Sequence, residues 1–160
     1  MTIWSAIAGG FAGTIVLTTA LSGASELGLT RMDLPFLLGT ALTANRAKAR
    51  LLGFVLHLLF GLGFAVIYFV VFQAIGRSGW LLGALFGVVH ALFSLTTLVN
   101  ILLPAVHPLM GSNFTAADST PLLEPPGFLM LNYGRSTPIV TVLAHVAYGA
   151  IVGGCLRMAG

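Results

Sequence analysis

Two histidines lie inside long apolar stretches of this chain, and each is followed four residues later by glycine. His57 precedes Gly61 and His145 precedes Gly149, with an aromatic residue directly before each glycine. Ionisable side chains within apolar segments point to function, and paired neutral imidazoles suit a transition metal or the iron of haem. The pattern predicts a metal or haem site at His57 and His145, with Gly61 and Gly149 opening space for a flat cofactor.

The same histidines also have a purely structural interpretation. Histidines in membrane helices often hydrogen-bond a hydroxyl or carbonyl group of a neighbouring helix, which contributes about 0.6 kcal/mol. Cys155 is the only cysteine, which rules out an internal disulfide and a zinc cluster built from cysteines. The sequence contains no GxSxG, HExxH, CxxC or glycine-rich phosphate-binding motif, so it favours a protein that is not an enzyme.

Further polar residues fall near the histidines when depth is counted at about 1.5 Å per residue. On this count, Ser22 and Thr97 lie at the same depth in the membrane as His57 and His145. By the same count, His90 lies about 10 Å deeper in the membrane than His57 and His145. This distance separates it from the two histidines and favours a packing role for it.

Four ionisable residues are expected to rim an entrance above the histidines, where they could pass protons or a cation. The alternative is that two of these residues, Asp33 and Glu124, have structural roles. They would then cap turns or pair with Arg31 or Arg135. The four rim residues are Glu26, Asp33, His107 and Glu124.

Four apolar stretches must position these residues. The 160 residues are 58% hydrophobic and only 7% charged, with a mean hydropathy of +1.02, and about 20 apolar residues suffice to cross a bilayer. The sequence predicts an all-α, four-transmembrane-helix bundle that forms one integral membrane domain over the whole chain. The expected spans are residues 3–28, 51–75, 80–103 and 139–158, with an ordered proline-rich connection at 104–138.

Charge predicts the orientation of this bundle. The four-residue turn at 76–79 makes the second and third spans antiparallel neighbours, so the two long connections share one face. These connections hold five of the seven basic residues, and cytoplasmic loops are enriched in Lys and Arg. Both termini are therefore expected outside the cell, and the bases are expected to meet membrane lipid rather than nucleic acid. The five bases are Arg31, Arg46, Lys48, Arg50 and Arg135.

The two halves of the chain resemble each other. Gly9 and Gly13 match Gly83 and Gly87 as GxxxG patterns, and the histidine motifs match in the second span of each half. Two spans per half keep the same orientation, so the pattern predicts a parallel internal repeat of helices 1–2 and 3–4. Small residues let helices approach closely, and contacts are expected at Gly61, Gly83, Gly87, Gly149 and Gly153.

Four segments of the sequence also resemble a family of small four-span bacterial membrane proteins. They are MDLPFLLG at 32–39, HPLM at 107–110, LLEPPGFLMLNYGR at 122–135 and HVAYGAIVG at 145–153. The resemblance implies a four-helix fold and a bacterial inner membrane. It carries over no activity, cofactor or ligand residues.

Three functions remain open from the sequence. The first is the histidine site for a metal ion or haem. The second is a non-catalytic accessory or scaffold subunit that packs against a membrane-protein partner or forms a homo-oligomer. The third is a small-solute or proton carrier, whose path would be lined by Thr14, Thr18, Ser22, Glu26, His57 and His145.

Overall fold

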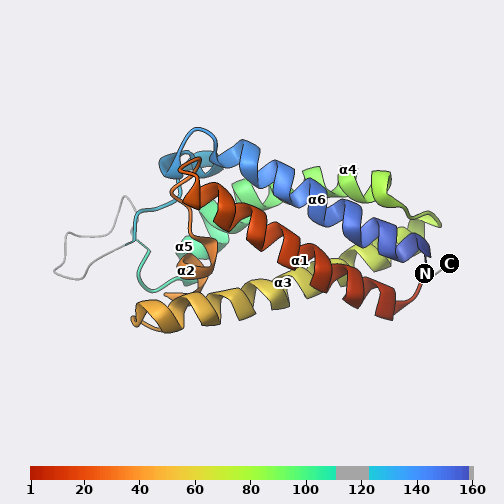
Figure 1. The fold of residues 1–160 in the computed structure, drawn as a ribbon, viewed down its shortest axis with the longest axis horizontal. Helices are drawn as coiled ribbons and strands as arrows, with labels where there is room; N and C mark the ends of the chain where they lie inside the picture. Colours follow the sequence, from red (N-terminus) through yellow and green to blue (C-terminus); the bar gives the residue numbers. More distant parts are fainter. Residues whose placement is uncertain (111–122, 159–160) are drawn as a thin grey trace.

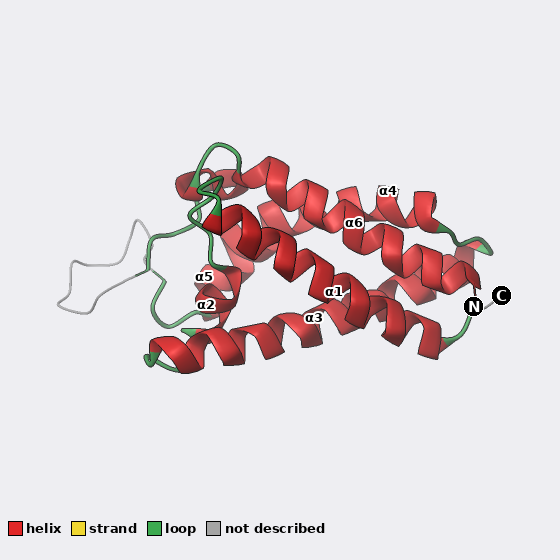
Figure 2. Cartoon of the chain, in the orientation of Figure 1, coloured by secondary structure: helices red, strands yellow, loops and turns green. Residues whose placement is uncertain are grey.

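The computed structural model describes residues 1–110 and 123–158, and these residues fold as a bundle of long helices (Figure 1, Figure 2). The all-α class predicted from the sequence is confirmed. Short elements, α2 (Leu34–Gly39) and the 3₁₀ helix η2 (Phe128–Tyr133), lie in the connections. The long helices are α1 (Ile3–Glu26), α3 (Arg46–Ile75), α4 (Trp80–Phe93) with its continuations η1 (Ser94–Leu102) and α5 (Leu103–Val106), and α6 (Thr137–Met158).

In the described part of the chain, four helical stretches are long and apolar enough to cross a membrane: α1, α3, α6, and the stretch Trp80–Val106 formed by α4, η1 and α5. Local signals set where they begin and end. The side chain of Asn45 caps α3 by accepting from the Lys48 N–H at 3.0 Å, so the helix starts ahead of its apolar run. It stops at Gly76, whose φ of 71° is in the left-handed region that favours glycine.

Glycines bring α6 and α4 into close contact. A Cβ added at Gly149 would lie 2.1 Å from the carbonyl oxygen of Gly83, and one at Gly87 would lie 2.3 Å from that of His145. On the other side of the bundle, a Cβ at Gly61 would lie 1.8 Å from the Thr14 hydroxyl of α1. The glycines expected at helix contacts are therefore at such contacts, because only a missing side chain permits these approaches.

The helices form a row in the order α3, α1, α6, α4, and α3 and α4 do not pack closely along their lengths. Aromatic rings fill the seam between them near the 76–79 turn. Phe72 contacts Phe86 with ring centroids 5.0 Å apart, and Phe64 stacks on His90 at 3.8 Å. Farther from the turn, the seam opens into a pocket.

The two long connections lock together at the other end of the bundle. His107 is only 4% exposed and donates its Nε2–H to the carbonyl of Leu37 at 3.0 Å, while its Nδ1 accepts from the Leu109 N–H at 3.2 Å. Arg31 pairs with Glu124 at 3.1 Å. His107 therefore ties the second connection to α2 and does not face an entrance.

Candidate functional site

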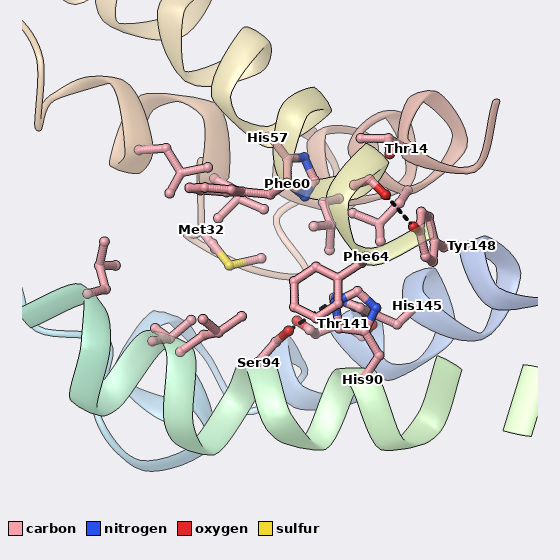
Figure 3. A pocket seen from close by; sticks show the side chains of 18 of the residues that line it. Thr14, Met32, His57, Phe60, Phe64, His90, Ser94, Thr141, His145 and Tyr148 are labelled. Atoms are coloured by element: carbon pink, nitrogen blue, oxygen red, sulfur yellow. Dashed lines mark hydrogen bonds between the residues drawn. The ribbon is translucent and has the colours of Figure 1, made fainter. Parts of the chain in front are cut away.

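A cavity of about 230 Å³ lies in the seam between α3 and η1, and every long helix contributes to its wall (Figure 3). Its wall is mainly aliphatic and aromatic, with a few polar side chains at the inner end. The residues that supply polar groups there are Thr14, His57, His90, Ser94, Thr141, His145 and Tyr148.

One side of this pocket is formed by residues on the outer surface of the bundle. Phe60 of α3 and Val106 of α5 both line the cavity, and they are 52% and 76% exposed. Leu102 of η1 lines it as well and is also exposed. The pocket therefore opens sideways between α3 and the η1–α5 stretch, on an apolar surface.

His57 is held in one tautomer by α1. Its Nδ1 lies 2.8 Å from the hydroxyl oxygen of Thr18, whose own O–H donates to the carbonyl of Thr14 at 2.8 Å. A hydroxyl has one proton to donate. With that proton on the Thr14 carbonyl, Thr18 accepts from the Nδ1–H of His57. A neutral His57 consequently carries its lone pair on Nε2.

His145 reaches the same state through its own helix. Its Nδ1 lies 2.8 Å from the carbonyl oxygen of Thr141, which can only accept. The Nε2 of His145 is then the acceptor, with the Ser94 hydroxyl at a long 3.5 Å. Tying the Nδ1–H to a protein acceptor is also how histidines are oriented when Nε2 serves as a ligand.

His90 lies beside His145, which corrects the depth estimate made from the sequence. The two ring centroids are 4.7 Å apart in an edge-to-face arrangement, so the expected separation of His90 from the site is wrong. The estimate assumed that the helices end at one level. In the structure, α4 continues through η1 and α5 to Val106. The contact of Gly87 with His145 fixes the position of α4 along the axis of α6.

Two polar atoms of residues that line the pocket have no hydrogen-bond partner among the described residues. The Thr141 hydroxyl is one, although the residue is 2% exposed, and Nδ1 of His90 is the other. Threonines in helices commonly bond the carbonyl four residues back, as Thr14 and Thr18 do. The Thr141 side chain instead lines the cavity, where a ligand could meet it.

Tyr148 forms part of the pocket wall and links two helices. Its hydroxyl donates to the carbonyl of Gly61 at 2.5 Å, which ties α6 to α3. Gly61 therefore lines the pocket through its backbone, whereas Gly149 lies in the contact with Gly83 and is not part of the wall. Thr97 is not part of the wall either.

Ser22, Glu26 and Asp33 line a separate polar groove of about 490 Å³ beside α1 and α3. Thr18 also lines this groove and bonds His57, so the groove and the pocket meet at that hydrogen bond. Asp33 caps α2 through the Phe36 N–H at 3.0 Å and pairs with Arg50 at 2.9 Å. Glu124 lies elsewhere, paired with Arg31.

Sequence reasoning found His57 and His145 but missed Thr141 as a pocket residue. The four-residue spacing of Thr141 and His145 on one helix was the signal that could have found it. No sequence signal links Thr18 to His57, because they come from different helices.

Among the described residues, no group of three or more His, Cys, Asp or Glu side chains is arranged to hold a metal ion. Comparison with models of known families, with curated proteins and with solved structures finds no match to this chain.

Proposed function

We propose that this chain is a four-span integral membrane protein that binds an uncharged lipophilic molecule, taken up sideways from the bilayer into the pocket between α3 and η1. The observation that carries this proposal is the shape of the pocket. It opens on the apolar outer surface and ends at the imidazoles of His57 and His145.

The outer surface of the helices supports the membrane location. Large apolar side chains are exposed along every long helix, for example Trp4, Val70, Leu85 and Ile139 at 58–74%. Leaving such area in water costs about 25 cal/mol per Å², whereas acyl chains solvate it without that cost. We place the basic connections on the cytoplasmic face of a bacterial inner membrane and both termini outside, by the charge asymmetry.

The lining of the pocket favours a neutral ligand. Its described wall contains no carboxylate and no Lys or Arg, so a charged molecule would be desolvated without a counter-charge. Neutral imidazole and hydroxyl groups can orient a polar end of an otherwise apolar molecule.

The metal or haem prediction remains a second form of this proposal. The Nδ1–H of each histidine is held by a protein acceptor, as in metal sites, and the thioether of Met32 lines the same pocket. A divalent cation would find no anionic ligand in this wall, so we rank it below an uncharged molecule.

The test is the content of the purified protein. Full-length protein extracted in mild detergent should release a stoichiometric lipophilic compound on solvent extraction, detected by mass spectrometry. The double variant His57→Phe, His145→Phe should lose it, and Val66→Phe, at an exposed position of α3 outside the pocket, should keep it. Absorbance and elemental analysis of the same samples identify haem or metal instead. The proposal is refuted if the purified protein contains no such compound and also binds none that is added.

A carrier of protons or small solutes is a second candidate, because the polar groove reaches the pocket. Ser22 and Glu26 line that groove, and Thr18 joins it to His57. In proteoliposomes this function predicts a flux that depends on pH and falls severalfold in Glu26→Gln. Ser25→Ala, a small change in the same groove, serves as a control. Equal flux in Glu26→Gln and the unaltered protein removes this candidate.

A further inference from the structure

We infer that the molecule bound in this pocket is a lipophilic hydroquinone, whose two O–H groups donate to Nε2 of His57 and of His145. This inference rests on the proposed function, because it assigns a chemical class to the ligand of the same pocket.

The first step is to establish which nitrogen of each imidazole carries the proton. Thr18 accepts the Nδ1–H of His57, since the Thr18 proton is already donated to the Thr14 carbonyl. The Thr141 carbonyl accepts the Nδ1–H of His145. Each neutral ring therefore presents a lone pair, not an N–H, at Nε2.

The second step is what such lone pairs select. A ketone, quinone or ether has only acceptor oxygens, so it leaves the two Nε2 lone pairs desolvated without a hydrogen bond, even where its own oxygen accepts from the Thr141 hydroxyl. A hydroxyl group supplies the missing donor. The unpartnered Thr141 hydroxyl, which lines the same cavity, can donate to the oxygen of that group.

The third step is the shape of the inner end. Phe64 and Tyr148 contribute aromatic rings to this end of the wall together with His90, and Phe64 already stacks on His90 at 3.8 Å (Figure 3). Aromatic rings pack favourably face to edge or offset on one another, so this end suits a flat ring better than a flexible chain. The aliphatic residues toward the opening suit an apolar tail, and they include Leu98, Leu102, Leu103 and Val106.

A binding experiment tests the ligand class. The detergent-solubilised full chain is titrated, without oxygen, with an alkyl hydroquinone, its dimethyl ether, the matching alkyl quinone and an aliphatic alcohol of equal chain length. The hydroquinone should bind about tenfold more tightly than the ether and the quinone, as two net hydrogen bonds predict. The quinone is no larger than the hydroquinone, so steric exclusion does not explain a preference over both.

Different outcomes contradict different claims. Equal affinity for hydroquinone, ether and quinone overturns the inference and leaves the proposed function standing. Tighter binding of the aliphatic alcohol than of the hydroquinone overturns the assignment of a ring. Binding of none of the four probes counts against the proposed function itself.

A second measurement reads the tautomers directly. Nitrogen-15 NMR of histidine-labelled protein should show that His57 and His145 are protonated at Nδ1 and unprotonated at Nε2. Thr18→Val removes the acceptor for His57, and the preference for hydroquinone over quinone should fall about threefold, the share of one hydrogen bond. Thr19→Val is the matched control, because Thr19 is exposed and makes no bond to His57. An Nε2-protonated signal for both rings, or an unchanged preference in Thr18→Val, contradicts the inference.

Discussion

Hydrogen bonds at Nδ1 or Nε2 give the histidines of this protein different roles. His57 and His145 donate through Nδ1, to Thr18 and to the Thr141 carbonyl, which leaves Nε2 as the acceptor; at His145 the Ser94 hydroxyl lies 3.5 Å from it. His107 has the opposite tautomer, because its Nδ1 accepts from Leu109 and its Nε2 donates to Leu37. The first two rings retain an acceptor for a ligand, whereas both nitrogens of His107 are used within the fold.

The structural role of His107 predicts a loss of stability without it. His107→Ala leaves the buried Leu37 carbonyl without its ring partner and removes the contact with Thr40 at 3.3 Å. We expect the free energy of unfolding to fall by about 1–3 kcal/mol, measured by denaturant titration in detergent micelles. Lys48→Ala, at an exposed position, should change it little. Equal stability of His107→Ala and the unaltered protein would show that this link is not needed.

The environment of Tyr133 predicts that the protein loses stability at alkaline pH. Its hydroxyl donates to the Glu124 carbonyl at 2.8 Å. Burial, and secondly the Glu124 carboxylate, raise the pKa of Tyr133 from 10.0 to about 12, against a lowering effect of Arg31. The folded state thus keeps a proton that the unfolded state loses above pH 10, so stability is complete below pH 10 and declines as the pH rises through 12.

The check is a comparison of unfolding free energies from pH 9 to about 12. Tyr133→Phe has no such proton, so its stability should decline less than that of the unaltered protein over this range. Parallel curves for the two proteins would contradict the assigned shift. The difference between the curves cancels the contributions of the other titrating groups.

At the scale of elements, the third span departs from a regular α-helix next to the pocket. Ser94–Leu102 is a π-helix, with Asn100 donating its side-chain N–H to the Leu95 carbonyl at 2.5 Å. Pro104 follows closely and has no N–H to donate. Wide helical turns of this kind often occur at functional sites. Here the π-helix contributes Ser94, Leu98 and Leu102 to the wall of the pocket.

The α4–α6 contact predicts how glycine substitutions differ. A Cβ at Gly149 would meet the Gly83 carbonyl at 2.1 Å, whereas one at Gly63 would meet nothing within 4 Å. Gly149→Ala should therefore force α4 and α6 apart and cost about 1–3 kcal/mol. Gly63→Ala should be neutral or slightly stabilising, since alanine favours helix by about 1 kcal/mol. Thermal unfolding in detergent compares the pair, and similar melting temperatures would argue against this packing.

At the scale of the whole molecule, the site exists because the bundle is a row and not a closed ring. The backbone of α3 lies against α1 and that of α4 against α6, whereas α3 and α4 meet through aromatic side chains only near the 76–79 turn. Aromatic rings close their seam at one end, and the seam stays open beside η1. The proposed ligand would therefore reach the histidines from the side, through this open seam.

The proposed orientation predicts which loops are accessible from outside the cell. In a Cys155→Ala background, Ser78→Cys in the 76–79 turn should react with a membrane-impermeant maleimide on intact cells. Thr43→Cys, in the connection before α3, should react only after permeabilisation. Mass-tag gels measure both. The reverse pattern would invert the topology and would overrule the charge asymmetry.

Much of the architecture could be predicted from the sequence. The apolar stretches predict four helices, and the glycine spacing predicts close contacts that Gly149 and Gly83 make. The internal repeat stays a prediction. His57 and His145 were identified because polar residues are rare in such stretches, and both line the pocket. The position of His90 was not predictable, because it depends on the stagger of α4 against α6.

The sequence by itself determined the helical elements and their apolar surfaces, because long runs of apolar residues in lipid must satisfy their backbone hydrogen bonds within each helix. Only the tertiary structure decided which polar groups meet. The Thr18–His57 bond and the pocket between α3 and η1 depend on side-chain contacts between helices that are distant in sequence. No local pattern encodes such lateral contacts, since they arise when all four helices pack together.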